Sequence, residues 1–152
     1  MLRVKFFSAV LLFLISFVLQ ARFLAFFDWS PNLMLAALLT AVFFLEFLEI
    51  LLLALFAAWL LNWQPGVSAE LLFFLLLPLF FFALARFSPW RRWLSAVVAT
   101  IAGITLLYLG RDYSSFLVLP HLVFADILFS VAFGMLLYQI LRLLESNRPL
   151  GI

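Results

Sequence analysis

The stretch LMLAALLTAVFFLEFLEILLLALFAAWLLNW, from Leu33 to Trp63, decides the fold because it is almost wholly apolar and contains neither glycine nor proline. As one helix it would be about 45 Å long at 1.5 Å per residue, and as two helices each would be about 22 Å long. Two carboxylates, Glu46 and Glu49, divide the stretch near its middle. It therefore forms either one long helix or two short helices joined by a turn at these glutamates.

The composition of the whole chain indicates an integral membrane protein. Of its 152 residues, 69% are apolar and only 11% are charged, whereas soluble domains have about 25% charged residues. A hydrocarbon core about 30 Å thick takes roughly 20 helical residues to cross, and the charges fall at about that interval. Because no segment alternates with a period of two, helices are expected rather than strands. We predict an all-α fold in which residues 1–152 form a single transmembrane domain.

The polar residues contain no pattern typical of an enzyme or a cofactor site. The chain has no cysteine, one histidine and seven scattered carboxylates, so we expect no metal, no cofactor and no catalytic centre. The nine basic residues are spread along the chain, which argues against a nucleic-acid partner. An enzyme of lipid metabolism stays open, because such enzymes need only two or three polar residues at the membrane interface.

The first twenty residues can be interpreted as a secretory signal or as a membrane helix. Arg3 and Lys5 precede an apolar run, as in a signal peptide. Leu19-Gln20-Ala21 supplies only one of the two small residues that a cleavage site needs, and the apolar character resumes after Arg22. An uncleaved first helix is the preferred interpretation.

Two serine-proline pairs are typical of helix starts, with the serine as N-cap and the proline as first helical residue. They are Ser30-Pro31 and Ser88-Pro89. Combined with the apolar runs, they predict six helices over residues 6–27, 31–46, 48–63, 69–87, 90–109 and 118–144.

The distribution of arginine and lysine favours six crossings over five. With a turn near the two glutamates and the N-terminus inside, only Arg22 and Arg111 lie outside. The basic residues then on the cytoplasmic side are Arg3, Lys5, Arg86, Arg91, Arg92, Arg142 and Arg148. Five crossings would move several of them outside, against the positive-inside rule. We predict a compact six-helix bundle with both termini in the cytoplasm.

A buried carboxylate is expected in the last helix. Asp126 lies well inside the final apolar run, with Ser130 and Gly134 following at i+4 and i+8 on the same helical stripe. It can be a proton or cation site, or a hydrogen-bonded residue at a helix contact. The second interpretation is preferred because no other buried acid or base lies at a compatible depth.

A second stripe of small residues lies on the preceding helix, with Ser95 and Gly103 among its members. Such stripes let helices approach closely in membranes. Helices joined by a short loop usually neighbour each other, so we hypothesise that the two stripes pack together.

The order of the segments resembles the MreD family of rod shape-determining proteins. The residues DWSPNLML, from Asp28 to Leu35, are similar to the start of that family's second helix, and Phe43 to Glu49 resembles its short cytoplasmic turn. Trp59 to Asn62, followed by Pro65-Gly66, resembles its Gly-Leu-Leu-x-Asp stretch, although the family's aspartate is Asn62 here.

The resemblance implies a non-enzymatic scaffold of the bacterial cell-elongation machinery in the inner membrane. The partners implied are a bitopic MreC-like protein, the filament protein MreB, the glycosyltransferase RodA and a penicillin-binding protein, beside membrane lipid. It also implies a fold similar to the substrate-binding subunits of energy-coupling-factor transporters. The candidates for helix packing or partner contact are Pro31, Asn32, Asn62, Gly66, Ser95, Gly103, Asp126, Ser130 and Gly134.

Two other functions remain open from the sequence. One is a transporter subunit that binds a small metabolite, for which Asn32, Asn62, Arg22, Asp112 and His121 are the polar groups available. The other is a small pore former, which is disfavoured because the helices offer almost no polar stripe to line an aqueous channel.

Overall fold

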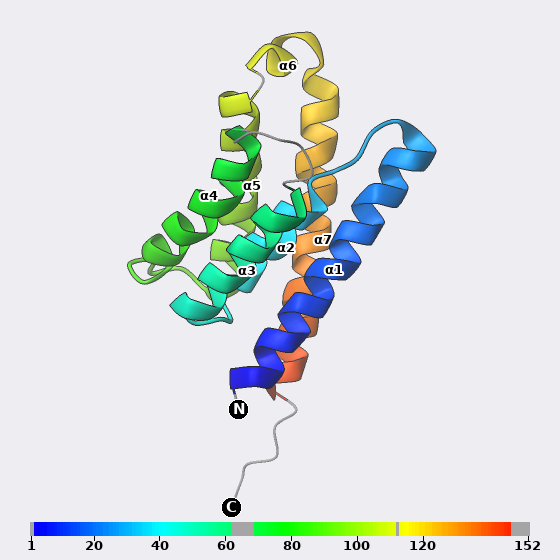
Figure 1. Ribbon diagram of the computed structural model, residues 1–152. Coiled ribbons are helices and arrows are strands. Elements are labelled where there is room, and N and C mark those ends of the chain that lie inside the picture. The colour runs from blue at the N-terminus through cyan, green and yellow to red at the C-terminus, as the bar shows by residue number, and fades with distance from the viewer. Residues whose placement is uncertain (1, 62–68, 112, 147–152) are drawn as a thin grey trace, which may run out of the picture.

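The computed structural model describes residues 2–61, 69–111 and 113–146, which are almost wholly α-helical and contain no strand (Figure 1). The all-α class predicted from the sequence is therefore confirmed. The helices in chain order are α1 (Leu2–Phe27), α2 (Leu33–Ala41), α3 (Phe47–Leu61), α4 (Ala69–Ala85), α5 (Arg92–Arg111), α6 (Tyr113–Val118) and α7 (Pro120–Ser146).

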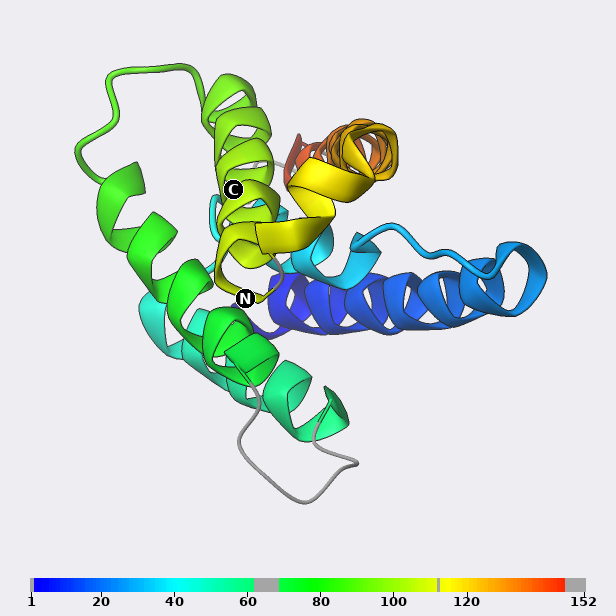
Figure 2. The same cartoon turned by 90° about the horizontal axis from the view of Figure 1, so that it is seen from above.

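The short helix α2 forms the centre of the bundle. All nine of its residues are buried, and it contacts α1, α3, α4, α5 and α7. Figure 2 shows α2, in cyan, in the middle of the surrounding helices. Leu35, Ala36 and Leu39 have no exposed surface. The core of the molecule is thus built around a helix that other helices enclose on every side.

The stretch from Leu33 to Trp63 contains two helices over its described part, with the break earlier than predicted. The helix expected over 31–46 ends at Ala41, and the chain turns through residues 42–46. In this turn the N–H of Phe43 donates to the Thr40 carbonyl at 3.3 Å. The N–H of Glu46 donates to the Glu49 carboxylate at 3.0 Å, as in one half of a capping box, and so helps to start α3.

The start of α2 also differs from the prediction. The N-cap is Asn32 and the first helical residue is Leu33, not Pro31. The Asn32 side chain makes no hydrogen bond to its own helix. The serine-proline signal failed here because other helices supply the caps of α2, as described below.

Other helix boundaries differ from the prediction by one to four residues. Helix α1 begins at Leu2 and ends as predicted at Phe27. Its end is followed by Asp28 in the left-handed region, with φ of 53°, a conformation that aspartate tolerates better than most residues. Helix α5 begins at Arg92, two residues later than expected, and the six-residue helix α6 before α7 was not predicted.

Three helices of the described residues are long and apolar enough to cross a membrane. They comprise Val4–Phe27, Arg92–Arg111 and Pro120–Ser146. The helices Phe47–Leu61 and Glu70–Ala85 are apolar but shorter. Helix α2 would extend only about 14 Å at 1.5 Å per residue.

Ion pairs place several helix ends at the same end of the bundle. Lys5 of α1 pairs with Glu145 of α7 at 2.7 Å, and Arg92 of α5 lies 3.7 Å from the same carboxylate. We call this the Lys5–Glu145 end. Arg111 closes α5 at the opposite end, where it pairs with Glu70 of α4 at 3.2 Å. The first and last helices thus begin and finish together (Figure 1).

Candidate functional site

The buried carboxylate of Asp126 binds three other residues through four hydrogen bonds. Its Oδ1 accepts from the backbone N–H of Asn32 at 2.7 Å and from the Ser130 hydroxyl at 3.0 Å. Its Oδ2 accepts from the side-chain amide of Asn32 at 2.6 Å and from the Tyr108 hydroxyl at 2.6 Å. Asp126 has no exposed surface. One side chain of α7 therefore joins the start of α2 to the end of α5.

The N-terminus of α2 is capped by two other helices. The carboxylate of Asp126 accepts from the N–H of Asn32, and the Gln20 side chain of α1 accepts from the N–H of Met34 at 3.0 Å. The first N–H groups of a helix have no intrahelical partner, and burying them unsatisfied costs free energy. A negative side chain at this position also interacts favourably with the helix dipole. These two long-range caps explain how a short buried helix can begin inside the bundle.

The geometry of Asp126 supports the structural interpretation reached from the sequence. Each carboxylate oxygen already receives two donors. No group of three or more His, Asp or Glu side chains within the described ranges could hold a metal ion. The arrangement is suited to holding three helices at fixed depth.

The small-residue stripes lie against α2. The two stripes are expected to pack on each other. Helices α5 and α7 do contact each other, but a Cβ added at Gly103 would collide with Leu39 of α2. A Cβ added at Gly134 would lie 3.2 Å from the Thr40 hydroxyl of α2 and 3.6 Å from that of Thr100 in α5. Both glycines therefore give α2 room between the two longer helices.

Ser95 has a different place from the rest of its stripe. It is buried at the start of α5. Its hydroxyl lies 3.0 Å from that of Ser88, and the Ser88 hydroxyl accepts from the N–H of Trp90 at 3.4 Å. These contacts order the turn before α5, which begins at Arg92 instead of residue 90.

A small polar cavity of about 160 Å³ lies beside the capped end of α2. It is lined by Gln20, Ser30, Asn32, Glu70, Leu107, Tyr108 and Arg111. The ion pair between Arg111 and Glu70 contributes to its wall. Asn32 and Tyr108 thus face both this cavity and Asp126.

The remaining predicted candidates divide into three groups. Pro31 lies in the segment before α2, where its carbonyl accepts from the N–H of Leu33 at 2.8 Å. His121 is exposed at the start of α7. Asn62 and Gly66 lie outside the described residues.

Two residues of the site were missed from the sequence. Tyr108 of α5 donates to Asp126 of α7, and Gln20 of α1 accepts from Met34 of α2. The residues next to Tyr108 and Gln20 in the sequence give no sign of these partners. Asn32 was singled out, but its pairing with Asp126 was not predicted.

Comparison with known proteins gives no match to a family model, to a curated protein or to a solved structure.

Proposed function

We propose that this chain is an integral membrane protein that crosses the bilayer six times, with both termini on the cytoplasmic side. Three helices with spanning length and composition support insertion. The contact between Lys5 and Glu145 supports an even number of crossings, because the first spanning helix must then begin at the same face at which the last one ends. The basic residues Arg86, Arg91 and Arg142 belong to the face that is cytoplasmic in this topology.

Helix α2 is the unusual member of the six. At about 14 Å it cannot cross a hydrocarbon core of about 30 Å, so the segment before it completes the second crossing. Irregular backbone at membrane depth is tolerated where protein surrounds it. In the segment before α2, Pro31 is buried and the N–H of Asn32 donates to Asp126, which supports such a path at the end next to α2.

For its role, we propose a non-enzymatic scaffold of the bacterial cell-elongation machinery in the inner membrane. The MreD-like order of segments motivates this role, and the surface of α1 is the observation that carries it. Only 11% of an 18-residue segment of α1 is buried. Exposed apolar side chains follow one face of the helix at spacings of three and four residues, namely Val4, Phe7, Leu11, Ile15 and Val18. Such a stripe is suited to packing against a partner's membrane helix.

Co-purification with an MreC-like bitopic protein tests the scaffold role. We expect the double variant Phe7→Ala/Leu11→Ala to lose that partner. The matched control is Phe124→Ala/Leu128→Ala, which removes the same two residue types, also exposed and four residues apart, from α7. The proposal is wrong if neither variant changes co-purification, or if deletion of the gene leaves cell width and length unchanged.

The alternative is a membrane transporter subunit of the energy-coupling-factor type that binds a small molecule. The polar cavity beside Asn32 and Tyr108 favours it, because a cavity with several hydrogen-bonding groups can hold a small polar metabolite. Mass spectrometry of molecules released from gently purified protein separates the two roles. A scaffold releases only lipid, whereas a transporter subunit releases a stoichiometric metabolite.

A further inference from the structure

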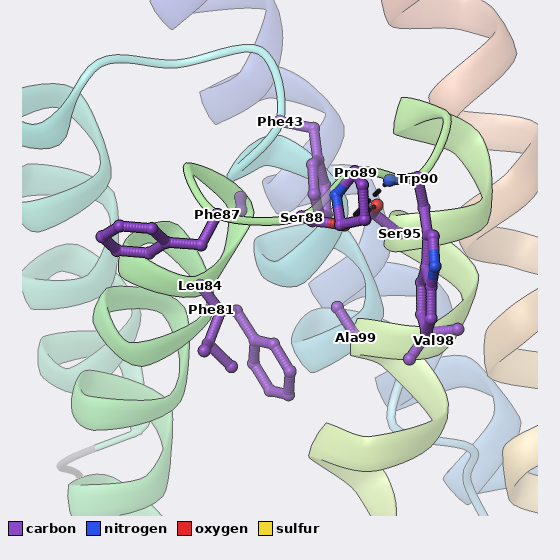
Figure 3. Close-up of a pocket in the computed structure, with 11 residues that line it drawn as sticks. Phe43, Phe81, Leu84, Phe87, Ser88, Pro89, Trp90, Ser95, Val98 and Ala99 are labelled. Carbon is purple, nitrogen blue, oxygen red and sulfur yellow. Dashed lines mark hydrogen bonds between the residues drawn. The ribbon is translucent and has the colours of Figure 1, made fainter.

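A groove opens between α4 and α5 at the Lys5–Glu145 end of the bundle. Its volume is about 380 Å³ and its lining is almost wholly apolar. Phe81 and Leu84 line it from α4, and Val98 and Ala99 line it from α5. Figure 3 shows the Phe81 ring pointing into the space between the two helices. The groove is therefore suited to an apolar occupant.

Polar and amphipathic groups gather at one end of this groove. The hydroxyls of Ser88 and Ser95 lie 3.0 Å apart there, beside Pro89 and Trp90 (Figure 3). Trp90 is 54% exposed. Tryptophan is enriched at the level of lipid headgroups, so this end of the groove is expected to lie at the membrane surface.

Two arginines lie in the turn beside the groove, and a third, Arg92, begins α5. Arg86 lies over the Phe82 ring, 5.0 Å from its centroid. Arg91 is exposed and its side chain makes no ion pair with any described residue. Arg92 lies 3.7 Å from Glu145, but that carboxylate binds Lys5 more closely, at 2.7 Å. The chain beside the groove thus carries positive charge, although none of these arginines is among the residues that line the groove.

The other acidic groups at this end make no ion pair with these arginines among the described residues. Glu46 and Glu49 lie at the turn before α3, where the Glu49 carboxylate accepts from the backbone N–H of Glu46. Neither glutamate lines the groove. The groove itself is apolar, and Arg86 and Arg91 lie in the turn beside it.

We propose that this groove binds an anionic phospholipid of the cytoplasmic leaflet, with an acyl chain between α4 and α5 and the phosphate against Arg86 and Arg91. Arginine binds phosphate oxygens with two parallel N–H donors. Basic pockets between membrane helices on the cytoplasmic side are suited to anionic headgroups. The apolar lining accommodates the acyl chain.

The size of the groove favours a lipid chain over a protein segment. An α-helix about 10 Å across with its side chains fills about 420 Å³ in one turn of about 5.4 Å, so a cavity of about 380 Å³ holds less than one turn. An acyl chain is a single file of methylene groups and fits between two packed helices. This inference rests on the proposed membrane topology, but it does not depend on the scaffold role.

Native mass spectrometry of the full chain with dioleoyl phosphatidylglycerol and dioleoyl phosphatidylcholine tests the proposal. We expect the wild type to retain phosphatidylglycerol preferentially. Each basic residue near an anionic headgroup contributes about fivefold in affinity, so Arg86→Gln/Arg91→Gln should weaken phosphatidylglycerol binding by roughly 20-fold. Binding of phosphatidylcholine should not change.

Two further variants separate a specific site from general attraction. The control Arg22→Gln/Arg142→Gln also removes two charges, from exposed positions on α1 and α7 that do not line the groove, and should leave lipid binding unchanged. Val98→Trp fills the groove at a position that is 37% exposed, and should weaken binding of both lipids. Thermal unfolding of each variant confirms that it is folded.

Three results would overturn the proposal. Unchanged phosphatidylglycerol binding in Arg86→Gln/Arg91→Gln would exclude the headgroup site. An equal loss in Arg22→Gln/Arg142→Gln would show that net charge alone determines binding. If Val98→Trp changed the oligomeric mass and left lipid binding intact, a second copy would occupy the groove. None of these results would affect co-purification with an MreC-like partner, so failure here is distinguishable from failure of the scaffold role.

Discussion

At the scale of single residues, Asp126 decides how the helices are held together. A hydrogen bond inside a membrane protein contributes on average about 0.6 kcal/mol, so four bonds on one carboxylate are a modest total. These bonds matter more because, without them, the N–H of Asn32 would lose its acceptor. The N–H of Asn32 begins a helix inside the bundle and depends on the Asp126 carboxylate as its acceptor.

Replacing Asp126 therefore tests the structural role of the carboxylate. We expect Asp126→Ala to lower the free energy of unfolding by about 1 to 3 kcal/mol, because a buried N–H loses its partner. Ser130→Ala removes one hydroxyl bond from the same carboxylate and should cost about 0.5 to 1.5 kcal/mol. Equilibrium unfolding in mixed micelles measures both. An Asp126→Ala protein as stable as the wild type would show that the cap on α2 is dispensable.

The sequence identified only part of this site. Asp126 and Ser130 could be grouped because residues four apart share a helix face. The contributions of Tyr108, Gln20 and Asn32 depend on which helices pack together and at what depth. The pairing and relative depth of the helices are set by tertiary packing, which leaves no local pattern in the sequence.

At the scale of elements, α2 is the helix whose environment and end are hardest to predict from its own residues. Its residues are apolar on all sides, and a helix of that kind can face lipid or be enclosed by protein. The break before α3 could be expected from Glu46 and Glu49, since charged residues favour a turn at the surface. The end at Ala41 could not, because the residues 42–45 are as apolar as the helix before them.

The fit of α2 between its neighbours predicts that Gly103 cannot be enlarged. A side chain there meets Leu39 and the Phe81 ring, and overpacking a core typically costs about 1 to 3 kcal/mol. We expect Gly103→Leu to lower the melting temperature markedly in detergent. Ala132→Leu, at an exposed position of α7, is the control and should change little. An unchanged melting profile for Gly103→Leu would contradict the packing of α5 on α2.

At the scale of the whole molecule, charge and packing give the same arrangement of the ends. The arginine distribution predicts an even number of crossings from sequence alone. Independently, Lys5 in the first helix contacts Glu145 in the last, and Arg92 joins them from α5. Surface ion pairs add little stability, about 0 to 1 kcal/mol. Here they show that the start of α1, the start of α5 and the end of α7 lie together.

The topology is tested most directly by labelling single cysteines, since the chain has none of its own. Lys5→Cys and Ser146→Cys mark the two ends of the chain's helical part, and Tyr113→Cys marks the opposite end of the bundle. With a membrane-impermeant maleimide on intact cells, six crossings predict labelling of Tyr113→Cys alone, and labelling of all three after permeabilisation. Labelling of either Lys5→Cys or Ser146→Cys, but not both, on intact cells would place the first and last helices' ends on opposite faces and contradict the six-crossing bundle.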